Sequence, residues 1–145
     1  MLPEKIELEV VTPQRHVLDE QVESVEMPGK DGYLGILPGH APLMTELGIG
    51  ELTYRGTLGN ANGVLAVIRG FVEVLGDRVT VLAETAERAA EIDLARAEAA
   101  KARAEKRMAS GDPNIDMDRA FVALQSALIR IQIARKYRGA PVETR

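Results

Sequence analysis

The sequence has no cysteine, no tryptophan and few of the residues that carry most enzyme chemistry. Without cysteine the chain forms no disulfide and offers no thiolate nucleophile, which fits a reducing compartment. Only 2 histidines and three serines occur among 145 residues, so candidates for a general base or a nucleophile are scarce. The composition therefore argues against an independent enzyme.

Long apolar runs are also missing. No stretch of about 18 consecutive apolar residues occurs, so we expect no membrane-spanning helix. The first residues, MLPEKIELEV, lack a basic segment followed by an apolar one, so we expect no signal peptide. Aromatic residues make up 3% of the chain, which leaves few platforms for stacking bases and argues against nucleic acid as a partner.

Motifs for phosphate and metal binding are missing as well. The Gly29-Lys30 pair follows Ser24, where a P-loop needs a glycine. The two histidines, His16 and His40, have no close neighbour in sequence at the spacing of metal ligands, so we expect no metal site. A pairing of one histidine with a carboxylate distant in sequence stays open, but the sequence favours histidines with no metal-binding role.

Charge is distributed unevenly along the chain, whose overall net charge is −4. Residues 1–92 hold 7 Lys and Arg against 15 Asp and Glu, a net of −8, whereas residues 93–145 hold 11 against 7, a net of +4. An acidic first part thus precedes a basic second part. This asymmetry favours an acidic protein surface as the partner of the basic part.

Residues 1–86 have the pattern of an antiparallel β-sandwich with about ten short strands. In residues 5–12 apolar side chains alternate with glutamates, which is typical of a half-buried strand. Residues 63–84 contain three apolar segments in close succession, with a tight turn at Gly76-Asp77 between the last two. Turn signals recur about every 8–12 residues with no helical stretch between them, which disfavours a parallel βαβ sheet.

Residues 87–145 have the pattern of an antiparallel hairpin of two helices, at about 93–109 and 115–138, so the whole chain is predicted to be α+β. The first helix is rich in alanine and long charged side chains, and Asp93 suits its N-cap. The second carries more large aliphatic residues than one alanine-lined neighbour covers. We therefore expect the hairpin to need the sandwich, or another protein, to bury the remainder.

The segment GYLGILPGHAPL, residues 32–43, combines apolar side chains with glycines and prolines and has no charged residue. Two prolines do not suit a buried strand, and so many apolar residues do not suit a solvated loop. We interpret the segment as a turn whose apolar residues divide between the sandwich core and a contact with another protein. A hydrogen bond that anchors the loop explains His40 at least as well as a direct contact does.

A small group of polar residues has the composition of a nucleotide site. Asp93 and Arg96 are three residues apart and share a helix face, and Arg130 on the second helix could approach them. Together they could accept a hydrogen bond from an adenine amino group and hold phosphates. The simpler interpretation, which the sequence favours, is that Asp93 caps the helix and Arg96 is solvated.

Three segments in combination resemble the ε subunit of bacterial F-type ATP synthases: PGHAPL at 38–43, VTVLAETA at 79–86 and IDLARA at 92–97. The resemblance extends over essentially the whole chain. It implies an N-terminal β-sandwich and a C-terminal helical hairpin in a non-catalytic subunit of the rotating central stalk, which couples proton-driven rotation to ATP synthesis.

The resemblance also implies partners and a location. The sandwich would contact the γ subunit and the c-ring. The hairpin would switch between a state folded on the sandwich, which permits rotation, and an extended state that reaches the catalytic α/β subunits and inhibits ATP hydrolysis. The acidic loop of β would face its basic side chains. The subunit would be peripheral, at the cytoplasmic face of the bacterial inner membrane. Candidate contacts with γ and the c-ring are Tyr33, His40 and Met44, and candidate contacts with the catalytic subunit are Arg103, Arg107, Arg119 and Arg135.

In some members of that family an (I/L)-D-x-x-R-A motif and two arginines four apart on the second helix bind ATP. Residues 92–97 match the motif and Arg130 matches one arginine, but Ser126 stands where the other would be. A missing charge-assisted hydrogen bond, worth roughly 1.5–3 kcal/mol, would weaken affinity by about one to two orders of magnitude. We therefore expect no required cofactor, and weak or absent ATP binding at Asp93, Arg96 and Arg130.

Two other hypotheses remain open from the sequence. The chain could be principally a nucleotide sensor, which Ser126 argues against. It could also be a free-standing adaptor or nucleic-acid-binding module, which the scarce aromatic residues and the acidic sandwich disfavour.

Overall fold

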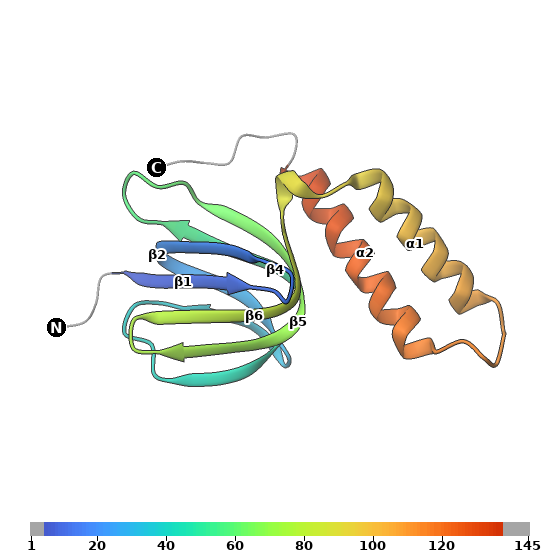
Figure 1. Cartoon of the computed structure of the whole chain (residues 1–145), viewed down its shortest axis with the longest axis horizontal. Helices are drawn as coiled ribbons and strands as arrows, with labels where there is room; N and C mark the ends of the chain where they lie inside the picture. The colour runs from blue at the N-terminus through green and yellow to red at the C-terminus, as the bar shows by residue number, and fades with distance from the viewer. Residues whose placement is uncertain (1–4, 138–145) are drawn as a thin grey trace.

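The computed structural model describes residues 5–137, which form a β-sandwich followed by a two-helix hairpin (Figure 1). This is the α+β architecture that the sequence predicts. The elements are β1 (Ile6–Val11), β2 (His16–Gly29), β3 (Gly32–Ile36), β4 (Leu43–Gly56), β5 (Gly63–Leu75), β6 (Arg78–Arg88), the short 3-10 helix η1 (Ala89–Glu91), α1 (Leu94–Ala109) and α2 (Met117–Tyr137).

The strands pair in the order β1-β6-β5-β4-β2-β3, and a further pairing of β1 with β2 closes the sheet on itself. Every pairing among the described residues is antiparallel except that of β1 with β6, which is parallel. The expected sheet was antiparallel throughout. The exception arises because β1 and β6 are the first and last strands, so no hairpin turn sets their relative direction.

The described residues form six strands where about ten short ones were expected. The difference comes from strand length: β2 and β4 have 14 residues each and β5 has 13, far more than a typical strand. Strands of this length bend and pair with different neighbours along their course. β2, for example, pairs with β1, β3 and β4.

The three strands expected in residues 63–84 are two, β5 and β6, joined at Gly76-Asp77 as predicted. The other expected break is a bend inside β5, where Arg69 has φ 49° and Gly70 has φ 147°. A Cβ on Gly70 would lie 1.9 Å from the carbonyl oxygen of Leu82, so only glycine fits this bend without a shift of backbone.

The sandwich has its own apolar core. The alternation seen in the first strand is borne out, since Ile6, Leu8 and Val10 are buried while the residues between them are half-exposed. Leu8 belongs to one apolar cluster with residues of the longer strands, such as Met27 of β2 and Leu52 of β4, and all three side chains are fully buried. The core is complete without the helices.

The two helices of the hairpin bury different kinds of side chain. α1 buries only Ala97 and Ala104, whereas α2 buries a longer set of residues: Ala120, Ser126, Ala127, Ile131, Ile133 and Ala134. Asp116 accepts a hydrogen bond from the amide of Arg119 at 3.1 Å, so α2 begins at Met117 rather than at the expected residue 115. The expected last residue, Arg138, lies outside the described residues.

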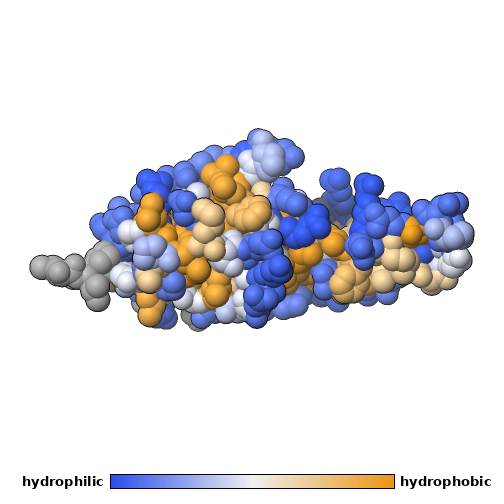
Figure 2. Space-filling model, turned by 90° about the horizontal axis from the view of Figure 1, so that it is seen from below, coloured by the Kyte–Doolittle hydropathy of each residue, from blue (hydrophilic) through white to orange (hydrophobic). Residues whose placement is uncertain are grey.

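The hairpin lies against the sandwich through the C-terminal part of α2, as the view in Figure 1 indicates. Ile133 and Ala134 pack against Val64 and Ala66 of β5 and against Ile92, which follows η1. The rest of α2 leaves apolar side chains in solvent, since Met117, Phe121 and Leu128 are 48%, 49% and 44% exposed. This matches the expectation that the hairpin is too apolar to cover itself. In the view of Figure 2, apolar surface is visible on both the sandwich and the hairpin.

Candidate functional site

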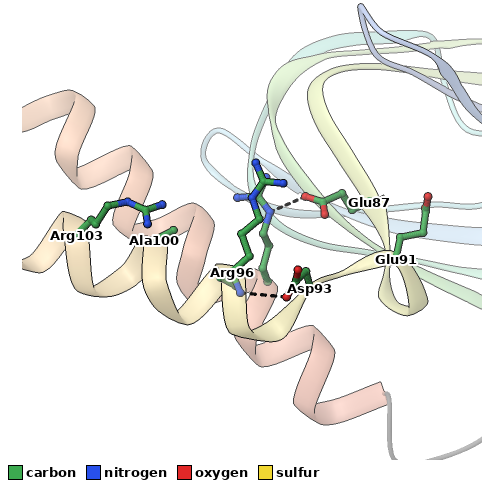
Figure 3. A pocket seen from close by; sticks show the side chains of 8 residues that line it. Glu87, Glu91, Asp93, Arg96, Ala100 and Arg103 are labelled. Carbon is green, nitrogen blue, oxygen red and sulfur yellow. Dashed lines mark hydrogen bonds and ion pairs between the residues drawn. The ribbon is translucent and has the colours of Figure 1, made fainter.

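A pocket of about 450 Å³ lies where the sandwich meets the hairpin (Figure 3). It brings together all three residues proposed from the sequence for nucleotide binding, Asp93, Arg96 and Arg130. It also contains Arg103, which the sequence assigned to a contact with a catalytic subunit. The lining residues are Glu87, Glu91, Asp93, Arg96, Ala97, Ala100, Arg103 and Arg130.

Arg130 is already engaged within this pocket. Its Nε donates a hydrogen bond of 2.5 Å to Oε1 of Glu87 on β6, and both side chains are about one quarter exposed, at 25% and 26%. Nothing in the sequence signalled this pair, because its members are 43 residues apart and share no motif. The contact joins the hairpin to the sandwich and places a carboxylate beside the arginine that a phosphate would need.

Glu91 adds a second carboxylate that stays ionised. Its oxygens accept hydrogen bonds from the Arg15 guanidinium at 2.8 and 3.1 Å, and one of them also accepts from the amide of Arg88 at 3.0 Å. The hydrogen bond from Arg15 is the main cause that holds the pKa of Glu91 below its usual range, against a smaller opposing effect of burial.

Asp93 acts as the N-cap of α1, as the simpler interpretation of the sequence had it. Its Oδ1 accepts a hydrogen bond of 3.1 Å from the backbone amide of Arg96. The side chains of the pocket therefore include three acids (Glu87, Glu91 and Asp93) and three arginines (Arg96, Arg103 and Arg130). A site so balanced in charge has little excess of positive potential for a triphosphate.

Ser126 does not line the pocket. It is 7% exposed, and its Oγ donates a hydrogen bond of 2.7 Å to the carbonyl oxygen of Val122 in its own helix. The hydroxyl is thus satisfied within α2. This position supplies the pocket with no cation.

A second polar contact holds the end of α2 to β4. The hydroxyl of Tyr137 donates a short hydrogen bond to Glu51, and Lys136 Nζ lies 3.7 Å from the same carboxylate. The Glu51 side chain is only 11% exposed. Burial, followed by the hydrogen bond to Glu51, raises the pKa of Tyr137. Sequence reasoning missed this contact, whose hydrogen-bonded partners are 86 residues apart.

The residues expected to contact γ and the c-ring have different environments. Tyr33 and Met44 are 60% and 68% exposed. The Tyr33 hydroxyl nevertheless accepts a hydrogen bond of 3.0 Å from the amide of Glu51. His40 Nδ1 lies 2.7 Å from the carbonyl oxygen of Ala41, which agrees with an anchoring role in the loop between β3 and β4.

The basic residues of the hairpin also differ. Arg107 and Arg119 are exposed, near the end of α1 and the start of α2. Arg135 forms an ion pair of 2.7 Å with Glu98 of α1, so it joins the two helices to each other. No helix within residues 5–137 is both long enough and apolar enough to cross a membrane.

Comparison with known families matches both parts of the chain. Residues 5–89 match the model described as ATP synthase, Delta/Epsilon chain, beta-sandwich domain, and residues 90–135 match ATP synthase, Delta/Epsilon chain, long alpha-helix domain. An ATP synthase epsilon chain of Syntrophobacter fumaroxidans is 46% identical over 135 residues, which cover 93% of this chain and 99% of that one. An epsilon chain of Solibacter usitatus is 58% identical over 53 residues, but these cover only 37% of this chain and 40% of that one.

Solved structures share the fold at lower identity. A chain in the mitochondrial ATP synthase of Euglena gracilis superposes with a TM-score of 0.80 at 22% identity, over 94% of this chain and 84% of that one. A chain of the Tetrahymena thermophila mitochondrial ATP synthase, in a structure of its central stalk and c-ring, gives a TM-score of 0.57 at 16% identity, over 94% and 98%.

Proposed function

The chain belongs to the ATP synthase delta/epsilon chain family, and from this membership we propose that it is a non-catalytic central-stalk subunit that couples proton-driven rotation to ATP synthesis. We further propose that its hairpin inhibits ATP hydrolysis by switching between a folded and an extended state. The observation that carries this second proposal is the limited contact that holds the hairpin to an otherwise complete sandwich.

Among the described residues, the contact contains a small apolar cluster and polar ties to Glu87 and Glu51. Ile133 is the fully buried large side chain that α2 contributes to the cluster, and burial of such a side chain is worth roughly 1.5–3 kcal/mol. Leu94, Ile129 and Tyr137 pack against the cluster while partly buried. The ties from Arg130 to Glu87 and from Tyr137 to Glu51 are partly solvated, and each adds on the order of 1 kcal/mol or less. A difference of a few kcal/mol between two states lets partner contacts shift their populations.

Release of the hairpin would make its charged and apolar side chains available to partners. Arg103 and Arg130 would be freed from the pocket, while Met117, Phe121 and Leu128 are exposed already. A surface that is both basic and apolar suits an acidic loop on the β subunit flanked by apolar groups. In the extended state the hairpin would reach the catalytic α/β subunits and block rotation in the direction of hydrolysis.

The sandwich would supply the contact with the γ subunit and the c-ring. Tyr33 and Met44 present exposed apolar surface, and His40 keeps the intervening loop in shape. With such contacts the chain would be held at the cytoplasmic face of the bacterial inner membrane through the complex, as a peripheral subunit.

ATP binding to the pocket would be weak or absent. Arg130 is paired with Glu87 through its Nε, which places a negative charge beside it, and Ser126 stands where a second cation would be needed. Calorimetry with ATP and the full chain tests this, and a dissociation constant in the micromolar range would contradict it.

Deletion of residues 93–145 tests the inhibitory role in the assembled synthase. ATP hydrolysis should rise, while assembly and proton coupling survive. Unchanged hydrolysis would reject inhibition by the hairpin without affecting membership of the stalk.

A locked variant separates loss of the hairpin from loss of its movement. This chain has no cysteine, so Glu87→Cys and Arg130→Cys can be joined by a short bismaleimide in the isolated chain, before it is assembled with the other subunits. A synthase locked in this way should hydrolyse ATP as fast as the deletion variant. Each single-cysteine variant, treated identically, is the control, and inhibition that persists in the locked enzyme would rule out the extended state as its cause.

A further inference from the structure

One cluster of ionisable side chains lies outside the proposed function. Glu9 of β1 and Asp19 of β2 are directly opposite each other in the antiparallel β1–β2 pair, and His16 is the first residue of β2. One ligand atom from each of the three residues lies within 4.8 Å of the other two. His16 Nε2 is 3.0 Å from Glu9 Oε2, although the two residues are only 7 apart in the sequence and so are not the long-range pair that the sequence left open.

The surroundings of the cluster are negative. Arg78 contacts Glu7 Oε2 at 2.8 Å. It lies 3.8 Å from Glu9 Oε1, which is not the oxygen that faces His16. Glu7 and Glu9 thus share one guanidinium, and Asp19 lies opposite Glu9 on the next strand, so the local excess of carboxylates attracts a cation.

We propose that Glu9, His16 and Asp19 form a surface site for a divalent transition-metal ion such as zinc. One imidazole nitrogen with two carboxylate oxygens is a ligand set that zinc, nickel and copper accept, whereas magnesium and calcium prefer oxygen alone. The remaining coordination positions are open to water or to a side chain of a neighbouring chain.

The distances are compatible with closure around a small ion. Tetrahedral zinc with bonds of about 2.0–2.1 Å holds its ligands roughly 3.4 Å apart. His16 and Glu9 are already at 3.0 Å, and the atoms of the cluster span at most 4.8 Å. Asp19 is exposed, so rotation of its side chain can bring its carboxylate inward.

The backbone below the cluster is anchored in the core. Leu8, Val10 and Leu18, which are sequence neighbours of proposed ligands, are buried in the sandwich core, and the register of the β1–β2 pair shifts between Val10 and Val11. The turn between the strands is fastened by a hydrogen bond of 2.9 Å from the amide of Thr12 to the carbonyl oxygen of Arg15. A bound ion would therefore tie the first strand to the second and stabilise the sandwich.

The test uses the purified full chain and zinc chloride alone, with binding followed by calorimetry and stability by thermal unfolding. We expect saturable binding of one ion and a rise in Tm, with magnesium chloride giving neither. The chain has only 2 histidines, so His16→Asn should lower zinc affinity by at least about tenfold and His40→Asn, the matched control, should leave it unchanged.

A charge variant tests the same site without removing a ligand. Arg78→Gln should raise zinc affinity severalfold, because it removes a competing cation near Glu9. His16 is half-exposed, so its variant should fold, which circular dichroism will verify. Absence of saturable zinc binding in both the natural chain and Arg78→Gln, full binding by His16→Asn, or loss of binding in His40→Asn would each overturn the proposal.

Discussion

Arg130 on α2 and Glu87 on β6 share a hydrogen bond of 2.5 Å that crosses from the hairpin to the sandwich. The same arginine is the residue expected to hold a phosphate. The hydrogen bond uses Nε of the guanidinium, so in the docked hairpin a phosphate would have to bind through the terminal nitrogens, beside the Glu87 carboxylate. We therefore expect Arg130 to serve mainly the docking of the hairpin.

Glu87→Gln should loosen the hairpin. The amide cannot form the ion pair, and we expect a loss of about 1 kcal/mol, which raises the undocked population about fivefold. Hydrogen exchange of amides in the C-terminal half of α2 measures this. The control is Arg135→Gln, which removes an ion pair of similar length between α2 and α1. Amide exchange in the C-terminal half of α2 should not rise in this variant as it does in Glu87→Gln. Equal effects of the two variants would show that the Glu87 pair does not hold the hairpin in place.

Docking of the hairpin should weaken at alkaline pH. The pKa of Tyr137 is raised by burial and by Glu51, so this tyrosine contributes stability below the ordinary tyrosine pKa of about 10 and loses it as pH rises through its own higher pKa. Proteolysis or amide exchange at the end of α2 between pH 9 and 11 follows this loss.

Tyr137→Phe should remove that alkaline step while lowering docking at neutral pH, since Glu51 loses a hydrogen-bond donor. The pKa of Tyr54 is also raised, chiefly by burial, so global unfolding is an unsuitable measurement and a probe on the hairpin is needed. An alkaline step that persists in Tyr137→Phe would assign it to another group.

The junction after the last strand should weaken in acid. Arg15 lowers the pKa of Glu91, so their contact contributes stability above the usual glutamate range and loses it as pH falls through the lowered pKa. Arg15→Gln should flatten the dependence of stability on pH below about 4.5. Denaturant unfolding at pH 3 to 7 checks this, and identical slopes for the two proteins would contradict it.

Gly70→Ala should destabilise the sandwich strongly. Its φ of 147° is one that residues with a side chain rarely adopt, and a Cβ would meet backbone at 1.9 Å. We expect a cost of at least about 1–3 kcal/mol. Gly35→Ala is the matched control, since nothing lies within 4 Å of the added carbon, and should be nearly neutral. Urea denaturation compares the two.

Met44→Lys should weaken association with the rest of the synthase while leaving the fold unchanged. The side chain is 68% exposed, so the isolated chain loses little, whereas a buried contact with a partner would gain an unpaired charge. Leu58→Lys, at a position 90% exposed in the loop between β4 and β5, is the control. Co-purification with the other subunits measures the difference, and equal retention would remove Met44 from the interface.

Local patterns in the sequence predict the local features of the fold. Alternation in β1, the turn at Gly76-Asp77 and the cap at Asp93 each depend on residues near one another, and each is found. Residues 63–75 were instead expected to hold two strands, but β5 continues through a bend at Gly70, and a glycine in an apolar run has the same appearance whether the strand ends or continues.

The long-range contacts in the candidate site could not be predicted from the sequence. Asp93, Arg96 and Arg130 do share a pocket, but the partner of Arg130 could not be foreseen among the many acids of the first part. The contact of Tyr137 with Glu51 likewise joins residues that are far apart in the sequence. Such pairs depend on how one element docks on another, which no spacing within a single element encodes.

The parallel pairing of β1 with β6 has a consequence for the order of folding. During synthesis β1 can meet β2 early, but its other edge waits until residues 78–88 have left the ribosome, so the sandwich closes late. The helices follow β6 in the chain and dock on strands that are by then complete. They are the last part of the chain to be made, and the sandwich core on which they dock contains no residue of either helix.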